Sequence, residues 1–143
     1  MKMRKIIIAT HHRLAEGMKD TVKYVLPDTA DIIAISAYLT NKPIDEEILS
    51  VLADVNFQED EVIVFTDMLG GSVNQAFARY LNNDNLHIIT GVNLPVIMSI
   101  LFDLNEGFID RDAIREAVNE AREQLIYVND FVATAPANDE GDE

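Results

Sequence analysis

The sequence of 143 residues contains no cysteine and no tryptophan, and it has only 6 glycines and 4 prolines. Without cysteine the chain can form no disulfide, thiolate nucleophile or sulfur metal site, which agrees with a reducing compartment. No hydrophobic run reaches the length of a transmembrane helix. The apolar run near the amino terminus ends at Thr10, too early for a signal peptide. We therefore expect a cytoplasmic protein without direct membrane insertion.

Basic residues are also scarce, since 11 Lys and Arg stand against 25 Asp and Glu, for a formal net charge of -14 at pH 7. Such a field repels polyanions, so nucleic acid is not an expected partner, whereas a protein with a basic face would be attracted. The length and a hydrophobic share of 48% suit one domain with a substantial core. We predict this domain over residues 1–131. Residues 132–143 are acidic and without periodicity, which predicts a disordered tail.

Short apolar segments alternate with amphipathic ones along the chain. Runs of β-branched residues without polar alternation are typical of parallel strands buried on both faces. The expected strands are Ile6 to Ala9, Asp31 to Ser36, Val62 to Phe65 and Leu86 to Ile89. Helical patterns follow each of them, and a last helix begins after an N-cap at Asp110. The segment Leu125 to Phe131 could continue that helix or form a strand, and its β-branched and aromatic content favours a strand.

This alternation predicts an α/β fold with a doubly wound, flavodoxin-like, mainly parallel sheet of strand order 2-1-3-4. The loops that follow the strands then share one edge of the sheet. In this order the first and third strands are neighbours at the topological switch point, where open α/β sheets bind ligands. We therefore expect His11 and Asp67, which follow those two strands, to meet across the crevice.

A histidine facing a carboxylate can act as a nucleophile, because the carboxylate holds one ring nitrogen protonated and leaves a lone pair on the other. The turn Gly70-Gly71-Ser72 supplies the complement: glycines let backbone N–H groups approach an anion, and the following helix directs its positive end toward it. Such a nest suits phosphate. Together these residues predict a phosphohistidine site in which positioning and electrostatics carry the catalysis.

Each feature taken singly also has an ordinary structural explanation. His11 alone could be a loop histidine, Asp67 a helix cap and the two glycines turn residues. His12 and His87 are expected to be structural or solvated. We predict no metal site, since adjacent histidines cannot easily direct both rings to one ion. Only the combination of His11, Asp67 and the glycine turn points to phosphoryl chemistry.

Three stretches, IIIATHHRLAEGM, VIVFTDMLGGSVNQAFAR and IITGVNLPVIM, resemble the enzyme IIA domain of the mannose-type (mannose, fructose, sorbose) sugar phosphotransferase system. The resemblance covers Lys5 to Phe131. It implies a doubly wound fold that dimerises, with a C-terminal strand exchanged between subunits in some members. It also implies a phosphocarrier that takes a phosphoryl group from phosphorylated HPr and passes it to enzyme IIB, with no cofactor.

By position, the resemblance makes His11 the phosphorylated histidine and Asp67 the carboxylate that holds its ring. Thr10, Gly70, Gly71 and Ser72 would form the surroundings of the phosphate. The sequence departs from the family pattern at His12, where glycine is usual, and at Val73, where proline is usual. His12 leaves open which imidazole reacts, and we favour His11 because it directly follows Thr10.

A regulatory paralogue that accepts phosphate but reports on sugar flux by binding another protein is one alternative, and two other functions also remain. One is the related phosphotransfer subunit of dihydroxyacetone kinase, which shares the fold and a strand-end histidine, although the loop TDMLGGS fits the sugar-transport branch better. The other is a non-catalytic flavodoxin-like module that binds a phosphate-bearing ligand. The binding-module hypothesis predicts that replacement of His11 has no effect on ligand binding.

Overall fold

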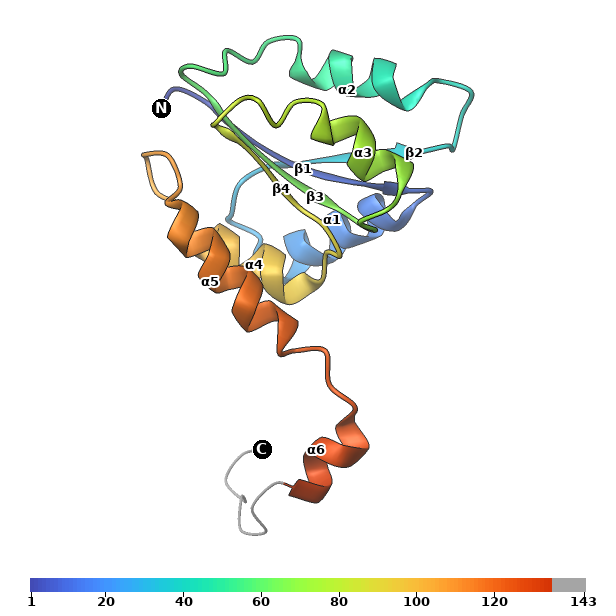
Figure 1. Cartoon of the computed structure of the whole chain (residues 1–143), viewed down its shortest axis with the longest axis vertical. Coiled ribbons are helices and arrows are strands. Elements are labelled where there is room, and N and C mark those ends of the chain that lie inside the picture. Colours follow the sequence, from blue (N-terminus) through green and yellow to red (C-terminus); the bar gives the residue numbers. More distant parts are fainter. Residues whose placement is uncertain (135–143) are drawn as a thin grey trace.

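The computed structural model describes residues 1–134 and shows a parallel sheet between two layers of helices (Figure 1). Strands and helices alternate through most of the chain, as the sequence predicts. In order, the elements are β1 (Arg4–His11), α1 (Leu14–Val25), β2 (Ile32–Ala37), α2 (Ile44–Leu52), β3 (Glu61–Thr66), α3 (Ser72–Ala78), β4 (Leu86–Ile89), α4 (Leu94–Asp103), α5 (Arg111–Arg122) and α6 (Val128–Thr134).

The sheet has the predicted order, β2-β1-β3-β4, and every neighbouring pair is parallel. The doubly wound α/β fold is therefore confirmed. In the register, Ile8 of β1 is paired with Ala34 of β2 on one side and with Phe65 of β3 on the other. β1 and β3 are the two central strands, so their carboxyl ends lie side by side.

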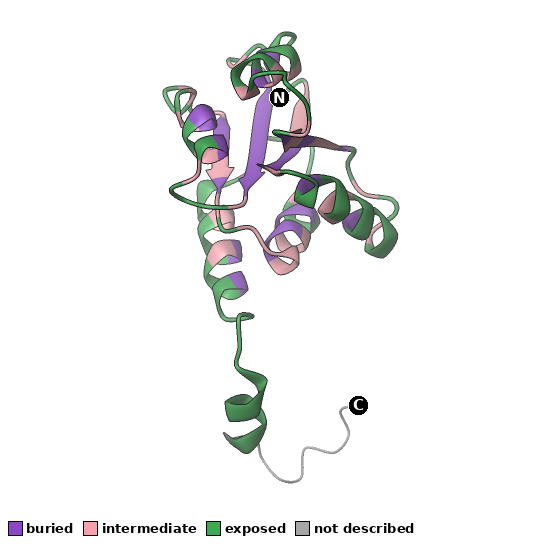
Figure 2. Cartoon of the chain, turned by 90° about the vertical axis from the view of Figure 1, so that its right-hand side faces the viewer, coloured by how far each residue is buried: buried purple, intermediate pink, exposed green. Residues whose placement is uncertain are grey.

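Alternation along β1 divides the core into two layers. Ile6 and Ile8 pack with α1, α4 and α5 on one face, whereas Ile7 and Ala9 pack with α2 and α3 on the other. Figure 2 shows the resulting band of buried residues running through the central strands. Because apolar side chains are covered on both faces, β1 has the unbroken apolar sequence of an interior strand. This packing fixes the strand ends on which the site is built.

Helix ends follow the local chemistry of the sequence. Asp110 is the N-cap of α5, as predicted, and its side chain accepts a hydrogen bond of 3.0 Å from the backbone N–H of Asp112. Asn93 caps α4 in the same way, accepting from the N–H of Val96 at 2.9 Å. The nearly all-round apolar character of α4 reflects its contacts with the sheet, α1 and α5 of the same chain. Phe102 of α4 nevertheless remains 70% exposed.

The prediction of a strand over Leu125 to Phe131 is wrong. Residues 125–127 have no regular structure and Val128–Thr134 form α6, which lies beyond α5, away from the sheet (Figures 1 and 2). A strand requires a hydrogen-bonded neighbour, and in this position the segment has no sheet edge beside it. The first residues of the predicted disordered tail, 132–134, are likewise helical. Its remaining residues, 135–143, lie outside the described part of the chain.

Candidate functional site at the carboxyl ends of the central strands

His11 and Asp67 meet at the edge of the sheet where the strands end. His11 is the last residue of β1, and Asp67 directly follows β3. The register of these neighbouring strands pairs Ala9 with Thr66, so the two residues leave the sheet at nearly the same level. The backbone therefore produces the juxtaposition that the sequence predicts.

One carboxylate oxygen of Asp67 binds His11 twice. Oδ2 lies 2.9 Å from the backbone nitrogen of His11 and 2.9 Å from its ring nitrogen Nδ1. The other oxygen, Oδ1, accepts from the N–H of Met68 at 3.1 Å. With both oxygens engaged, the carboxylate holds the imidazole in one orientation.

The charge of Asp67 determines the tautomer of His11. Partial burial opposes ionisation of this carboxyl group, but hydrogen bonds from the backbone and ring of His11 outweigh it and lower its pKa below the ordinary value. An ionised carboxylate can only accept hydrogen bonds, so Nδ1 of His11 carries the proton. The lone pair is then on Nε2, and the side chain of His11, 33% exposed, is open to a reactant.

Ser72 and Gly71 lie beside the Nε2 and Cε1 atoms of the imidazole. The hydroxyl oxygen of Ser72, the first residue of α3, is 3.5 Å from Nε2 of His11. A Cβ atom at position 71 would lie only 3.0 Å from Cε1 of His11, whereas one at Gly70 would meet no atom within 4 Å. A side chain at position 71 would therefore force the His11 ring to shift, whereas one at position 70 would meet no neighbour.

Asn74 holds the loop that contains these residues, and the sequence analysis did not single it out. Its Oδ1 accepts from the hydroxyl of buried Thr66 at 2.9 Å, and its Nδ2 donates to the carbonyl of Leu69 at 3.0 Å. These bonds tie the loop to the end of β3. The only available signal was its place in the stretch that carries the family resemblance, because an asparagine inside a helical pattern is otherwise unremarkable.

Thr10 is placed differently from the other predicted phosphate-binding residues. It is fully buried, and its Oγ1 accepts a hydrogen bond of 2.7 Å from the N–H of Ala15 in the first turn of α1. The hydroxyl therefore satisfies an otherwise unpaired helix donor. In this arrangement Thr10 fixes α1 next to His11.

His12 has an unusual backbone conformation for a residue with a side chain. Its φ is 56°, in the left-handed region that favours glycine. The N–H of His12 donates to the carbonyl of Ala37 at 2.8 Å. Among the described residues, His11 and not His12 has its ring on Asp67.

Tyr38 is a site residue that the sequence analysis missed. It follows the last residue of β2, has a φ of 68°, and its hydroxyl lies 2.6 Å from Oγ of Ser72. Its ring centroid is 5.6 Å from that of His11, with a tilt of 34°. Its position after a strand end was the available signal, but the direction of its side chain depends on a left-handed backbone that no sequence rule places at a tyrosine.

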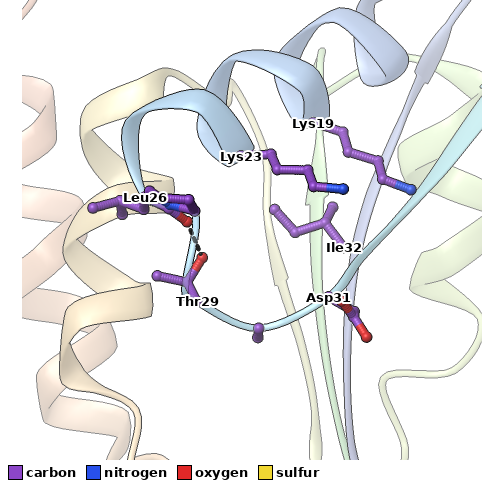
Figure 3. Close-up of a pocket in the computed structure, with 8 residues that line it drawn as sticks. Lys19, Lys23, Leu26, Thr29, Asp31 and Ile32 are labelled. Atoms are coloured by element: carbon purple, nitrogen blue, oxygen red, sulfur yellow. Dashed lines mark hydrogen bonds between the residues drawn. The ribbon is translucent and has the colours of Figure 1, made fainter.

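Other chemistry-bearing features of the described residues lie elsewhere. A cavity of about 140 Å³ between the end of α1 and the start of β2 is bordered by Lys19, Lys23 and Ile32 (Figure 3). It lies at the opposite edge of the sheet and is smaller than usual small-molecule sites of about 300–1,000 Å³. The pKa of buried His87 is lowered, because burial outweighs the opposing effect of the nearby Glu61 carboxylate. Within residues 1–134, no group of three or more His, Asp or Glu side chains is arranged to hold a metal ion.

The sheet and this site define the class: a doubly wound α/β domain with a strand-end histidine held by a carboxylate at the switch point. A family model described as the PTS system fructose IIA component, EIIA-man, matches residues 5–107. The chain therefore belongs to the mannose-type enzyme IIA family of the sugar phosphotransferase system (PTS). In the part of the chain that the structure describes, no helix has the length and apolarity to cross a bilayer.

Several known proteins are similar to this chain. The PTS system fructose-specific EIIA component of Bacillus subtilis (strain 168) is 24% identical over 102 residues, which is 69% of either protein. A crystal structure of a putative PTS permease from Klebsiella pneumoniae is 32% identical, with a TM-score of 0.83 over 92% of this chain and 95% of that one. A PTS IIA protein associated with the fucose utilization operon of Streptococcus pneumoniae is 27% identical, with a TM-score of 0.72 over 92% of this chain and 97% of that one.

Proposed function

We propose that the protein is a phosphocarrier that accepts a phosphoryl group on Nε2 of His11 and passes it on for sugar uptake. The observation that carries this proposal is the geometry of one carboxylate oxygen, which binds both the backbone N–H and Nδ1 of His11 at 2.9 Å. Membership of the enzyme IIA family supports it, since this family is a component of a phosphotransferase system.

In the proposed step, Nε2 attacks the phosphorus atom of the donor's phosphorylated side chain. The new P–N bond forms as the donor's bond to phosphorus breaks, and the donor side chain leaves with that electron pair. The imidazole of His11 gains positive charge in this step, which ionised Asp67 offsets through Nδ1–H. No proton is transferred in this step. In the second step the acceptor's side chain attacks the phosphorus atom, and the P–N bond to His11 breaks.

The phosphoryl oxygens require hydrogen-bond donors beside Nε2. We assign this role to the hydroxyl of Ser72 and to backbone N–H groups of the turn with Gly70 and Gly71, because this turn lies against the ring of His11. Thr10 contributes by fixing α1 through Ala15. With donor and acceptor both protein side chains, transfer needs no metal and no cofactor.

We infer that phosphorylated HPr is the donor and an enzyme IIB component the acceptor. Four large apolar side chains around the site, Leu14, Tyr38, Met68 and Leu69, are more than half exposed. They come from three different loops or helix starts at the same edge of the sheet. Exposed apolar groups that surround a reactive residue suit transient protein contacts. Such partners place the protein in the cytoplasm.

We further propose that the protein forms a homodimer through its C-terminal segment. Leu125, Tyr127, Val128, Phe131 and Val132 are all more than half exposed in the chain by itself. A run of apolar groups this dense is a typical subunit contact. Sedimentation should give twice the chain mass, and Tyr127→Ser with Val128→Ser should give the monomer, whereas Tyr24→Ser should remain dimeric. A wild-type monomer at micromolar concentration contradicts the dimer.

The experiment that tests the phosphocarrier is intact mass spectrometry after incubation with phosphoenolpyruvate, enzyme I and HPr. Wild type and His12→Ala should gain one acid-labile phosphoryl group, and His11→Ala should gain none. Loss in His12→Ala alone would move the site by one residue. Absence of any gain in folded wild type, beside a working acceptor, contradicts the proposal and favours the ligand-binding module.

Subsequent transfer to enzyme IIB tests the branch of the family. Phosphorylated protein should lose its phosphoryl group to IIB and not to dihydroxyacetone kinase subunits. The opposite result favours the kinase subunit, which the family match argues against.

A further inference from the structure

We propose that Tyr38 is a positioning residue that orients the Ser72 hydroxyl toward the phosphoryl group on His11. This inference rests on the proposed function. The phenol oxygen lies 2.6 Å from Oγ of Ser72, which in turn is 3.5 Å from Nε2 of His11. Tyr38 directly follows β2, Ser72 is the first residue of α3 and His11 is the last residue of β1, so the three side chains converge from separate parts of the sequence.

The direction of the Tyr38–Ser72 hydrogen bond follows from acidity. A phenol, with a pKa of about 10, is a stronger donor than an aliphatic alcohol, so Tyr38 donates and Ser72 accepts. The single hydroxyl proton of Ser72 is then free to point to the side of Nε2. In the free protein it faces the lone pair of Nε2, and after transfer it faces a phosphoryl oxygen.

The hydrogen bond that Ser72 accepts from Tyr38 also makes the Ser72 hydroxyl a better hydrogen-bond donor. Successive hydrogen bonds polarise one another, and the effect is largest where the last acceptor is an anion such as phosphate. Docking of a partner excludes water from the site, which strengthens a chain that is solvent-exposed in the free protein. The contribution of Tyr38 is therefore greatest during transfer.

The backbone of Tyr38 has an unusual conformation. A φ of 68° is unfavourable for any residue with a Cβ atom, and aromatic residues rarely adopt it. Ala37, which precedes it, is paired with His11 and accepts the N–H of His12, whose φ is also positive. The loops that follow β1 and β2 thus both leave the sheet through a left-handed residue at the same level. This turn carries the Tyr38 ring to within 5.6 Å of the His11 ring.

Tyr38 could instead serve only as an apolar contact for the partner, and kinetics separate the two roles. A contact residue changes the donor concentration at half-saturation, whereas a residue that acts through Ser72 changes the maximal rate of transfer. Tyr38→Phe is the sharp variant because it keeps the ring and removes only the hydroxyl. Tyr24→Phe is the matched control, since Tyr24 is 87% exposed on α1 and has no part in the site.

The test measures single-turnover transfer from phosphorylated HPr to wild type, Tyr38→Phe, Ser72→Ala, the double variant and Tyr24→Phe, each first shown to be folded by circular dichroism. We expect Tyr38→Phe to lower the maximal rate about five- to tenfold, as for one hydrogen bond in a charged chain, with the half-saturating concentration unchanged. The double variant should be no slower than Ser72→Ala, because Tyr38 acts through that hydroxyl. Tyr24→Phe should match wild type.

Three results overturn the inference: an unchanged maximal rate in Tyr38→Phe, a change confined to the half-saturating concentration, or additive effects of the two substitutions. All three require a wild type that is phosphorylated on His11. A wild type that takes up no phosphoryl group is a different outcome, which overturns the proposed function and this inference together.

Discussion

Replacement of Asp67 by asparagine removes the charge that holds the His11 ring and leaves the shape of the side chain. The substitution acts on two contacts, because Oδ2 of Asp67 accepts from both the backbone nitrogen and Nδ1 of His11 at 2.9 Å. The backbone contact is the same before and after transfer. The ring contact strengthens as the imidazole becomes positive, so its change in strength sets the effect on rate.

The expected loss follows from the strength of a charge-assisted hydrogen bond. Such a bond contributes about 1.5–3 kcal/mol, and each 1.36 kcal/mol changes a rate about tenfold. Asp67→Asn should therefore slow phosphoryl uptake by about 10- to 150-fold. Asp45→Asn is the matched control, since Asp45 forms an exposed ion pair with Arg79 and should leave the rate unchanged.

The assay is single-turnover transfer from phosphorylated HPr, followed by NMR assignment of the phosphorylated ring nitrogen. Wild type should carry the group on Nε2, because Nδ1 is occupied by Asp67. Uptake by Asp67→Asn within about threefold of wild type would refute the assigned role of the carboxylate. A wild-type product phosphorylated on Nδ1 would refute the proposed orientation of the ring.

Three further predictions concern backbone space, backbone strain and acidity. Gly71→Ala should slow transfer at least about tenfold, because the new Cβ would displace the His11 ring. Gly70→Ala should leave the rate unchanged, because a Cβ at position 70 meets no atom within 4 Å, and single-turnover rates of the two variants test the difference. His12→Gly should keep full phosphorylation and raise the free energy of unfolding by up to about 1 kcal/mol, measured in urea, because it relieves a positive φ. The folded-state pKa of Asp67 is lowered, so its contribution to stability is complete above the unfolded-state value and is lost as the pH falls through the folded-state value. The difference in unfolding free energy between wild type and Asp67→Asn should accordingly be constant above about pH 5 and shrink below pH 4; a constant difference down to pH 2 contradicts it.

The sheet was predictable because each strand carries its own signal. β-branched residues buried on both faces give β1 and β3 an apolar run that ends where polar chemistry begins, so strand ends and loop residues are read together. Once the order 2-1-3-4 is adopted, the meeting of His11 and Asp67 follows from topology alone. The predicted bounds of β4 match the observed ones, whereas β1 and β3 were predicted too short, since β1 extends to His11 itself. Because β1 forms hydrogen bonds with both β2 and β3, it continues beyond its apolar residues.

The parts of the site that were not predictable depend on side-chain direction. Tyr38 stands in a polar loop with no motif, and its contact with Ser72 requires a left-handed backbone that is unusual for tyrosine. For Thr10, in contrast, the sequence assigned a role that its hydrogen bond does not match. The resemblance places it near the phosphate, but its buried hydroxyl is taken by the N–H of Ala15. Sequence identifies which residues reach an edge, while hydrogen-bond partners decide what each of them does there.

The composition of the C-terminal segment predicted a strand, whereas the segment forms helix α6. Tyr127, Val128 and Phe131 favour a strand only where a pleated neighbour covers them, because β-propensity measures packing more than backbone preference. In the single chain the segment extends beyond α5, and from Val128 the backbone satisfies its own hydrogen bonds as a helix. The apolar side chains remain exposed in this helix. This composition is the basis of the proposed homodimer, and the oligomeric state of Tyr127→Ser with Val128→Ser tests that proposal directly.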